Sequence, residues 1–266
     1  MQPFPNIPED KKLIVGVGNA LIDILAYEDE DFLKKTGAAI GGMTYVEKEF
    51  IEKTLAMLSE QPITVPGGSA CNTVVGVGRL GGVARFIGKC GKGELGTFFE
   101  KDLKRQNVEP ALLRSDSPTG RVLSIVTPDA QRSMFTCLGA SAEMSPQDIS
   151  ENFFENAAVV HIEGYLLFNP QLILKVLKTA KASGALVSLD LPSYNVIKES
   201  HELLRPIVET SIDILMANED EAQAYTGQTD ETRAVNALAE KVDIAVLKIG
   251  ERGSLIAHNN EMVPIC

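Results

Sequence analysis

PGGSACNTVVGVGRLGGVARFIGKCGKGELG, residues 66–96, is the stretch that decides how the rest of the chain is interpreted. It opens with the glycine pair Gly67 and Gly68, and the small apolar residues that follow place Asn72 in the first turn of an expected helix. Glycines let a backbone approach a ligand closely, and a helix N-terminus offers unpaired N–H groups and a positive dipole end. The stretch therefore indicates a site for a polar small molecule, although a glycine pair alone is more typical of a tight turn before a closely packed helix.

Helices and strands are expected throughout the chain. Helical spacing predicts helices at residues 47–59, 69–80, 96–106 and 148–154, and Phe98, Phe99 and Leu103 are expected to form the apolar face of the third. From Ser145 onward, strand-length apolar runs alternate with helical segments, which predicts a mainly parallel sheet covered on both faces. Ligands of such sheets sit at the carboxyl ends of the strands. The polar residues that follow expected strands, and so predict one shared cleft, are Asp23, Asp190, Asn218 and Lys248.

The segment at residues 119–138 has a strand-like residue pattern that differs from the strand–helix alternation that begins at Ser145. Two β-rich runs flank Pro128-Asp129-Ala130-Gln131, whose residue types are typical of a turn, so we expect a β-hairpin. A second short strand and turn are expected at residues 37–46. These residues alone do not distinguish an ordinary edge hairpin from a cover over a ligand site.

Composition and charge exclude several classes of function. The formal net charge of −11 offers no basic stripe for nucleic acid, and no apolar run approaches the roughly 20 residues that span a bilayer. We therefore expect neither nucleic-acid nor membrane partners. The four cysteines are scattered without a C-x-x-C pair, which favours reduced thiols and a cytoplasmic protein. They are Cys71, Cys90, Cys137 and Cys266.

Two nucleotide-binding motifs of other families do not fit this sequence. The chain contains no G-x-x-x-x-G-K-[ST] segment, which makes a P-loop enzyme improbable. Gly16-x-Gly18-x-x-Leu21 lacks the third glycine of a dinucleotide-binding turn, and the next acidic residue lies too near for a ribose carboxylate. An NAD-dependent oxidoreductase is accordingly a remote alternative.

Several motifs in order point to one family. They are GG-x-x-x-N from Gly67, R-L-G-G from Arg79, F-I-G-x-x-G-x-x-x-x-G from Phe86, GNALID at residues 18–23, NEDE at 218–221 and KIGERG at 248–253. In this arrangement the chain resembles the ribokinase-like (PfkB) carbohydrate kinases, and the context of GNALID and GGMTYV is most similar to the adenosine-kinase-like branch. The resemblance implies an α/β, ribokinase-like three-layer sandwich with a mainly parallel sheet and a small β-sheet lid. Residues 1–266 would form a single kinase domain, with the lid made from about 37–46 and 119–138.

The resemblance also implies which residues bind which ligand. The acceptor, a nucleoside or sugar, would be bound by Asn19, Asp23, Gly67, Gly68 and Asn72. The nucleotide side, for ATP, would consist of Asn218, Glu221, Lys248, Gly250 and Gly253. Glu221 would organise Mg²⁺ indirectly, through water, because Mg²⁺ retains several waters and prefers oxygen ligands. Arg132, after the hairpin turn, is a candidate phosphate contact, and an exposed lid edge would allow a homodimer.

Two departures from the family pattern matter. Gly93 stands where the family often has an aspartate, so that carboxylate is absent. The family's G-A-G-D segment, which supplies an oxyanion hole and the aspartate that acts as general base, has no counterpart in these residues. We therefore expect that the C-terminal part of the fold is missing from this sequence, and we assign no catalytic residue in it. The expected function is ATP-dependent phosphorylation of a hydroxymethyl group of an adenosine-like nucleoside or a sugar. The alternative is a catalytically inactive nucleoside- or sugar-binding protein.

Overall fold

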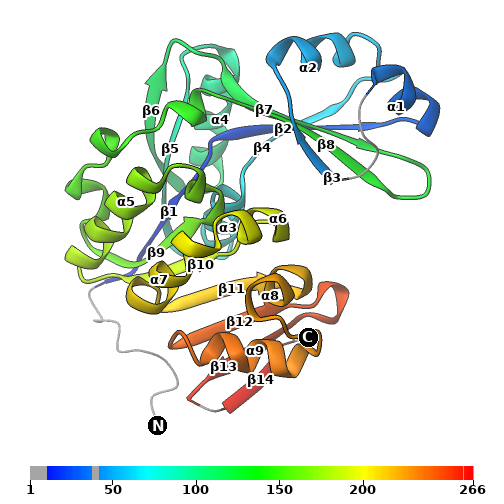
Figure 1. The fold of residues 1–266 in the computed structure, drawn as a ribbon. Coiled ribbons are helices and arrows are strands. Elements are labelled where there is room, and N and C mark those ends of the chain that lie inside the picture. The colour runs from blue at the N-terminus through cyan, green and yellow to red at the C-terminus, as the bar shows by residue number, and fades with distance from the viewer. Residues whose placement is uncertain (1–10, 38–41, 260, 266) are drawn as a thin grey trace.

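The computed structural model describes residues 11–37, 42–259 and 261–265, and its centre is a nine-stranded sheet (Figure 1). The strand order is β14-β13-β12-β11-β10-β9-β1-β5-β6. Strands β12 to β6 in this order are parallel, whereas β13 and β14 add antiparallel strands at one edge. The mainly parallel sheet is as expected. Its strands are β1 Leu13–Val17, β5 Val83–Gly91, β6 Val108–Ser115, β9 Ala157–Glu163, β10 Leu186–Asp190, β11 Ile214–Asn218, β12 Ile244–Lys248, β13 Ser254–His258 and β14 Glu261–Ile265.

Helices cover both faces of this sheet and create two hydrophobic cores. Alternate residues of a strand point to opposite faces, so Phe86 of β5 packs in one core and Ile87 in the other. The first face is covered by α3 Ser69–Arg79 and α4 Glu94–Arg105, and the second by α5 Pro170–Ala182, α7 His201–Ser211, α8 Glu219–Thr226 and α9 Glu231–Ala239. The expected three-layer arrangement is confirmed. None of the described helices is long and apolar enough to cross a bilayer.

A second sheet of five strands stands off from the first (Figure 1). The expected hairpin is present in it, because β7 pairs antiparallel with β8. One face packs on two short helices, with Ile22, Phe32, Ile51 and Phe135 in a common core. The strand order is β3 Gly42–Tyr45, β8 Arg132–Gly139, β7 Thr119–Val126, β2 Leu21–Tyr27 and β4 Ile63–Gly67, and the helices are α1 Glu30–Thr36 and α2 Lys48–Leu55.

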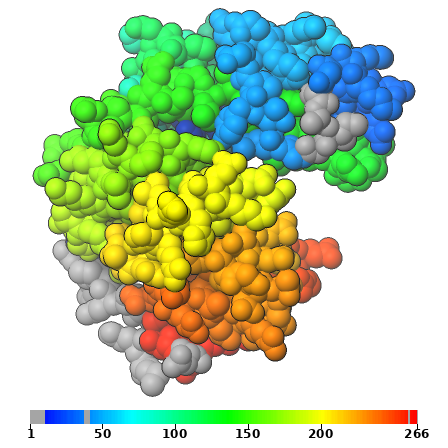
Figure 2. Space-filling model, in the orientation of Figure 1, coloured from blue at the N-terminus to red at the C-terminus, as the bar shows by residue number. Residues whose placement is uncertain are grey.

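Both segments expected to form a lid contribute strands to this five-stranded sheet, but residues 38–41 of the first lie outside the described residues. Strands β2 and β4 also belong to the sheet and were not anticipated in it. The space-filling view in Figure 2 shows a hollow between this part of the molecule and the body that carries α6 (Tyr194–Glu199).

Three local expectations were wrong. Asp23 does not follow a strand of the parallel sheet; it lies inside β2 and pairs with Val65 of β4. Residues 148–154 are not one helix: the backbone is extended at Ile149 and Ser150, which separates the 3-10 turn Pro146–Asp148 from a second one at Glu151–Phe154. Phe98 is not on the buried face of α4: it is 37% exposed, while Phe99 and Leu103 are buried.

Candidate functional site

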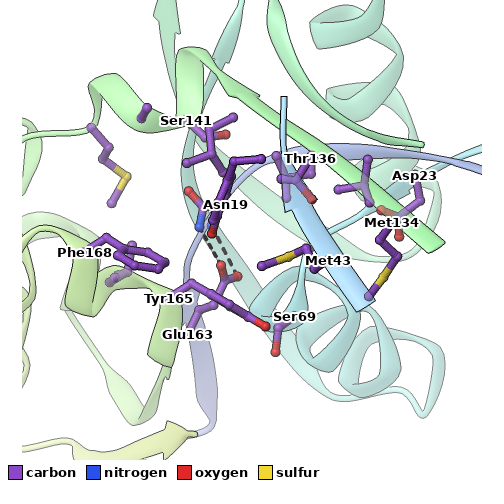
Figure 3. Close-up of a pocket in the computed structure, with 18 of the residues that line it drawn as sticks. Asn19, Asp23, Met43, Ser69, Met134, Thr136, Ser141, Glu163, Tyr165 and Phe168 are labelled. Carbon is purple, nitrogen blue, oxygen red and sulfur yellow. Dashed lines mark hydrogen bonds between the residues drawn. The ribbon is translucent and has the colours of Figure 1, made fainter. Parts of the chain in front are cut away.

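A pocket of 530 Å³ opens between the five-stranded sheet and the carboxyl ends of β1 and β9 (Figure 3). Four of the five residues expected to bind the acceptor line it: Asn19, Asp23, Gly68 and Asn72. They come from three places, namely the turn after β1, the middle of β2 and the start of α3. Residues up to 53 positions apart in sequence thus reach one cavity, because the chain passes from β1 into the five-stranded sheet at β2 and leaves it through β4 to begin α3.

Glu163, the last residue of β9, is the buried anchor of this pocket. Its Oε1 accepts a hydrogen bond of 2.6 Å from the Asn19 side-chain amide, and its Oε2 accepts from the backbone N–H groups of Asn19 at 3.3 Å and Ala70 at 3.4 Å. The Asn19 to Glu163 bonds are drawn in Figure 3. One carboxyl therefore joins the end of β1, the end of β9 and the first turn of α3. Sequence reasoning missed Glu163, although an acidic residue closing the apolar run AAVVHI was a usable signal.

Burial dominates the acidity of Glu163. It is 2% exposed, and loss of hydration raises the pKa of its carboxyl to about 7, while the hydrogen bonds from Asn19 and Ala70 lower that pKa. The negative charge of Asp190 raises it further. Glu163 can consequently exchange a proton near neutral pH.

The glycine pair shapes the floor beside Asp23. A Cβ atom on Gly67 would lie 2.2 Å from Oδ2 of Asp23, so the carboxylate occupies the space that this glycine leaves free. Gly68 has φ of 103°, and a Cβ there would lie 2.3 Å from the carbonyl oxygen of Asn19. Gly67 thus lies against Asp23 rather than on the pocket wall. Burial raises the pKa of Asp23, and the Arg132 guanidinium lowers it.

The other end of the pocket is apolar and aromatic. The rings of Tyr45 and Phe168 meet edge to face with centroids 5.9 Å apart, and Tyr165 stacks near Phe168 at 6.5 Å. Met43 and Met134, paired across β3 and β8, also line the pocket, and Figure 3 shows Met134 beside Asp23. The pocket therefore combines a polar end at Asp23 with an end suited to a flat apolar ring.

A second cluster lies where β10, β11 and β12 end. Asp190 accepts a hydrogen bond of 2.5 Å from Lys248 Nζ and another of 3.0 Å from the Ser69 hydroxyl. Because Ser69 lines the pocket, this carboxylate connects the pocket to the strand ends. Asp190 followed an expected strand, but its partners were not anticipated.

Asn218 and Glu221 form a reciprocal cap at the start of α8. Glu221 N–H donates to Asn218 Oδ1 at 2.9 Å, and both Glu221 oxygens accept from Asn218, from its backbone N–H at 2.8 Å and its amide at 2.9 Å. Burial raises the pKa of Glu221 to about 7, against the lowering effects of the Asn218 hydrogen bond and the Lys248 charge.

Gly250 and Gly253 bound a tight turn after β12. Their φ values are 60° and 93°, in the region that favours glycine, and Ile249 N–H donates to the Gly253 carbonyl at 2.9 Å. A Cβ on Gly250 would meet no atom within 4 Å. The five residues expected on the nucleotide side therefore lie on the ends of β11 and β12 and the connections after them, outside the pocket lining.

Glu221 and Asp190 are better placed to bind the waters around a Mg²⁺ ion than to bind the ion directly. Among the described residues, no three His, Cys, Asp or Glu side chains are grouped to hold a metal ion. Both oxygens of Glu221 are engaged by Asn218, and Asp190 is engaged by Lys248 and Ser69. A hydrated Mg²⁺ would meet these carboxylates through its waters.

This fold and site define a ribokinase-like α/β protein with a small-molecule pocket between two sheets. Residues 14–265 match the pfkB family of carbohydrate kinases, and the chain belongs to that family. Among solved structures, it is similar to adenosine kinase from Sinorhizobium meliloti, at 30% identity and a TM-score of 0.85, over 96% of this chain and 80% of that one.

Curated relatives include both nucleoside and sugar kinases. Guanosine-inosine kinase from Escherichia coli (strain K12) is 24% identical over 93% of this chain, and Fructokinase-2 from Solanum lycopersicum is 28% identical over 74% of it. The chain spans 60% and 64% of the lengths of these two relatives.

Proposed function

We propose that this protein transfers the γ-phosphoryl group of ATP to a hydroxymethyl group of a nucleoside, with a sugar as the second choice of acceptor. The observation that carries the proposal is the two-ended pocket, in which Asp23 lies at the polar end and Tyr45 and Phe168 at the aromatic end. A carboxylate accepts hydrogen bonds from vicinal hydroxyls, and stacked rings favour a flat base. A free sugar would leave the aromatic end unfilled. Kinship with guanosine-inosine kinase and adenosine kinase supports the nucleoside.

Asn19, Asp23 and Asn72 orient the acceptor in this proposal. Gly67 makes room for the Asp23 carboxylate, and Gly68 lets the backbone at the start of α3 come close to the ligand. Glu163 holds the Asn19 side chain in place by accepting its 2.6 Å hydrogen bond. The five-stranded sheet acts as a lid that excludes water, which would otherwise accept the phosphoryl group.

ATP binds at the strand-end cluster. Lys248 contributes a positive charge, and the turn bounded by Gly250 and Gly253 leaves open space beside the backbone at Gly250 for phosphate. Asn218 and Glu221 organise Mg²⁺ through its waters, and the ion neutralises charge on the phosphates when bound. Arg132, which lines the pocket, contacts the phosphate being transferred.

In the reaction, the acceptor oxygen forms a bond to the γ-phosphorus while the bond from that phosphorus to the bridging oxygen of ADP breaks. In this sequence, which contains no assigned base, the acceptor's hydroxyl proton passes to an oxygen of the phosphoryl group being transferred. The family's G-A-G-D segment, expected to supply the proton acceptor, is not in this sequence. The residues described here bind and align the two substrates, which accounts for most of the catalysis in phosphoryl transfer.

Calorimetric titration with adenosine, inosine, guanosine, ribose and fructose tests the acceptor. We expect nucleosides to bind at least ten times more tightly than the free sugars, and Asp23→Asn to weaken nucleoside binding. Equal affinity for ribose and adenosine would contradict a nucleoside site. Binding without any phosphoryl transfer from ATP would support the alternative, an inactive nucleoside-binding protein.

The proposal also includes the oligomeric state of the protein. The edge strand β4 exposes Ile63 and Val65, at 54% and 46%, and an exposed strand edge can pair with a second copy. We propose a homodimer through this lid, which sedimentation analysis tests.

The metabolite substrates and the absence of a paired-cysteine pattern favour a cytoplasmic location.

A further inference from the structure

Asp190 joins the two halves of the site through two different donors. Its Oδ2 accepts from the hydroxyl of Ser69, the first residue of α3, at 3.0 Å. Its Oδ1 accepts from Nζ of Lys248, the last residue of β12, at 2.5 Å. Ser69 lies on the wall of the acceptor pocket in Figure 3, whereas Lys248 precedes the glycine turn proposed for phosphate.

We infer that Asp190 is a positioning residue that couples acceptor binding to nucleotide binding. The inference rests on the proposed function and adds to it a thermodynamic link between the two half-sites. An ammonium group has three N–H donors, so Lys248 can keep its bond to Asp190 and still donate to phosphate oxygens. The same carboxylate holds Ser69, and with it the first turn of α3, where Gly68 and Asn72 face the acceptor.

The negative charge of Asp190 affects groups in both the acceptor pocket and the proposed nucleotide site. Its negative charge acts on Glu163, which holds Asn19 in the pocket, and on Glu221, which caps α8. It also acts on buried His161, one strand away on β9. A nucleotide whose phosphate draws Lys248 away from Asp190 would leave the negative charge of Asp190 less neutralised, and Glu163 in the acceptor pocket would experience that change. Conversely, an acceptor that orders the start of α3 fixes Asp190 and, through it, Lys248.

The chain contains a matched control pair. Lys181 and Asp213 also form a lysine–carboxylate contact, at 2.7 Å, in which Asp213 likewise accepts a second hydrogen bond, from Val187 N–H. The side chains of Lys181 and Asp213 are 39% and 17% exposed, against 41% and 17% for Lys248 and Asp190. The Lys181–Asp213 pair lies at the opposite end of β10, at the C-terminus of α5 and the start of β11.

The test is calorimetric titration of adenosine into the protein with and without the β,γ-imido analogue of ATP and Mg²⁺. In the wild-type protein we expect the analogue to strengthen adenosine binding by about fivefold or more, the usual range of coupling between sites. Asp190→Asn should reduce this factor below about twofold, because an amide cannot hold Lys248 by charge. Asp213→Asn should retain the wild-type factor.

Ser69→Ala keeps the result interpretable if Asp190→Asn does not fold. It removes one hydroxyl and should at least halve the coupling factor while Lys248 keeps its partner. If the wild type shows coupling that Asp190→Asn or Ser69→Ala leaves unchanged, the inference is overturned and the proposed function stands. If the wild type binds both ligands without coupling, the inference is likewise overturned. If it binds neither adenosine nor the analogue, the proposed function falls as well.

Discussion

The side-chain amide of Asn19 donates a 2.6 Å hydrogen bond to the carboxyl of Glu163, a residue 144 positions further along the chain. The contact closes the floor of the pocket between the ends of β1 and β9, which are neighbours in the parallel sheet. Glu163 is nearly inaccessible to solvent. Because Glu163 is buried and holds Asn19 in the pocket, we expect the protonation of this one carboxyl to affect both the stability of the fold and ligand binding.

Glu163→Gln should change how stability depends on pH. The pKa of this carboxyl is raised from 4.5 to about 7 in the folded protein, so its contribution to stability is fully present below about pH 4.5. That contribution is lost as the pH rises through about 7. We expect the wild-type-minus-variant difference in free energy of unfolding to fall by about 3 kcal/mol between pH 4.5 and 7.5. Urea unfolding at both values measures it, and an unchanged difference would refute the assigned shift.

Gly67→Ala should impair acceptor binding by displacing Asp23. The new methyl group would lie 2.2 Å from the carboxylate oxygen, which must move. We expect nucleoside affinity to fall at least tenfold by calorimetry. Gly76→Ala is the control, because a Cβ there meets nothing within 4 Å in helix α3, and it should raise stability by about 0.5–1 kcal/mol. Equal binding by the two variants would contradict the assigned packing.

Two buried threonines of the lid should respond in opposite ways to valine. Thr136 Oγ1 has no hydrogen-bond partner among the described residues, whereas Thr119 Oγ1 accepts from Gly91 N–H at 3.0 Å. Thr136→Val should therefore be neutral or stabilising by up to about 1 kcal/mol, and Thr119→Val destabilising by about 1–3 kcal/mol. Thermal unfolding of both variants measures this. A destabilised Thr136→Val protein would show that its hydroxyl is satisfied after all.

Phe168→Ala should separate nucleosides from sugars. Stacking of a base on an aromatic ring contributes about 1–3 kcal/mol, so adenosine binding should weaken roughly five- to 150-fold. Ribose binding should change little, because a free sugar does not reach Tyr45 and Phe168. Phe98→Ala removes an exposed ring on α4, away from the pocket, and should alter neither affinity. An equal loss for ribose and adenosine would place the base elsewhere.

The sequence predicted the helix after Gly67-Gly68 and the strands that end at Asn218 and Lys248, because local spacing and strand–helix alternation determine them. It predicted Asp23 as a pocket residue but put it after a strand of the wrong sheet. The segment LIDILAY is short and apolar, and only its pairing with β4 and β7 decides where it belongs.

The residues that sequence reasoning missed depend on distant contacts. Glu163 closes an apolar strand and looks like an ordinary polar strand end until burial and Asn19 are known. The partners of Asp190 lie 121 and 58 positions away. Such contacts follow from strand order, which the alternation of elements narrows but does not determine.

Product analysis by mass spectrometry tests the central claim most directly. The protein is incubated with adenosine, ATP and Mg²⁺, with Asp23→Asn as the control that lacks the acceptor carboxylate. We predict ADP and the nucleoside 5′-monophosphate in equal molar amounts, and much less of both with the variant. ADP with free phosphate and no nucleoside monophosphate would contradict a kinase, because water would then be the phosphoryl acceptor. Adenosine bound but unchanged after prolonged incubation would also contradict a kinase and would leave a nucleoside-binding protein.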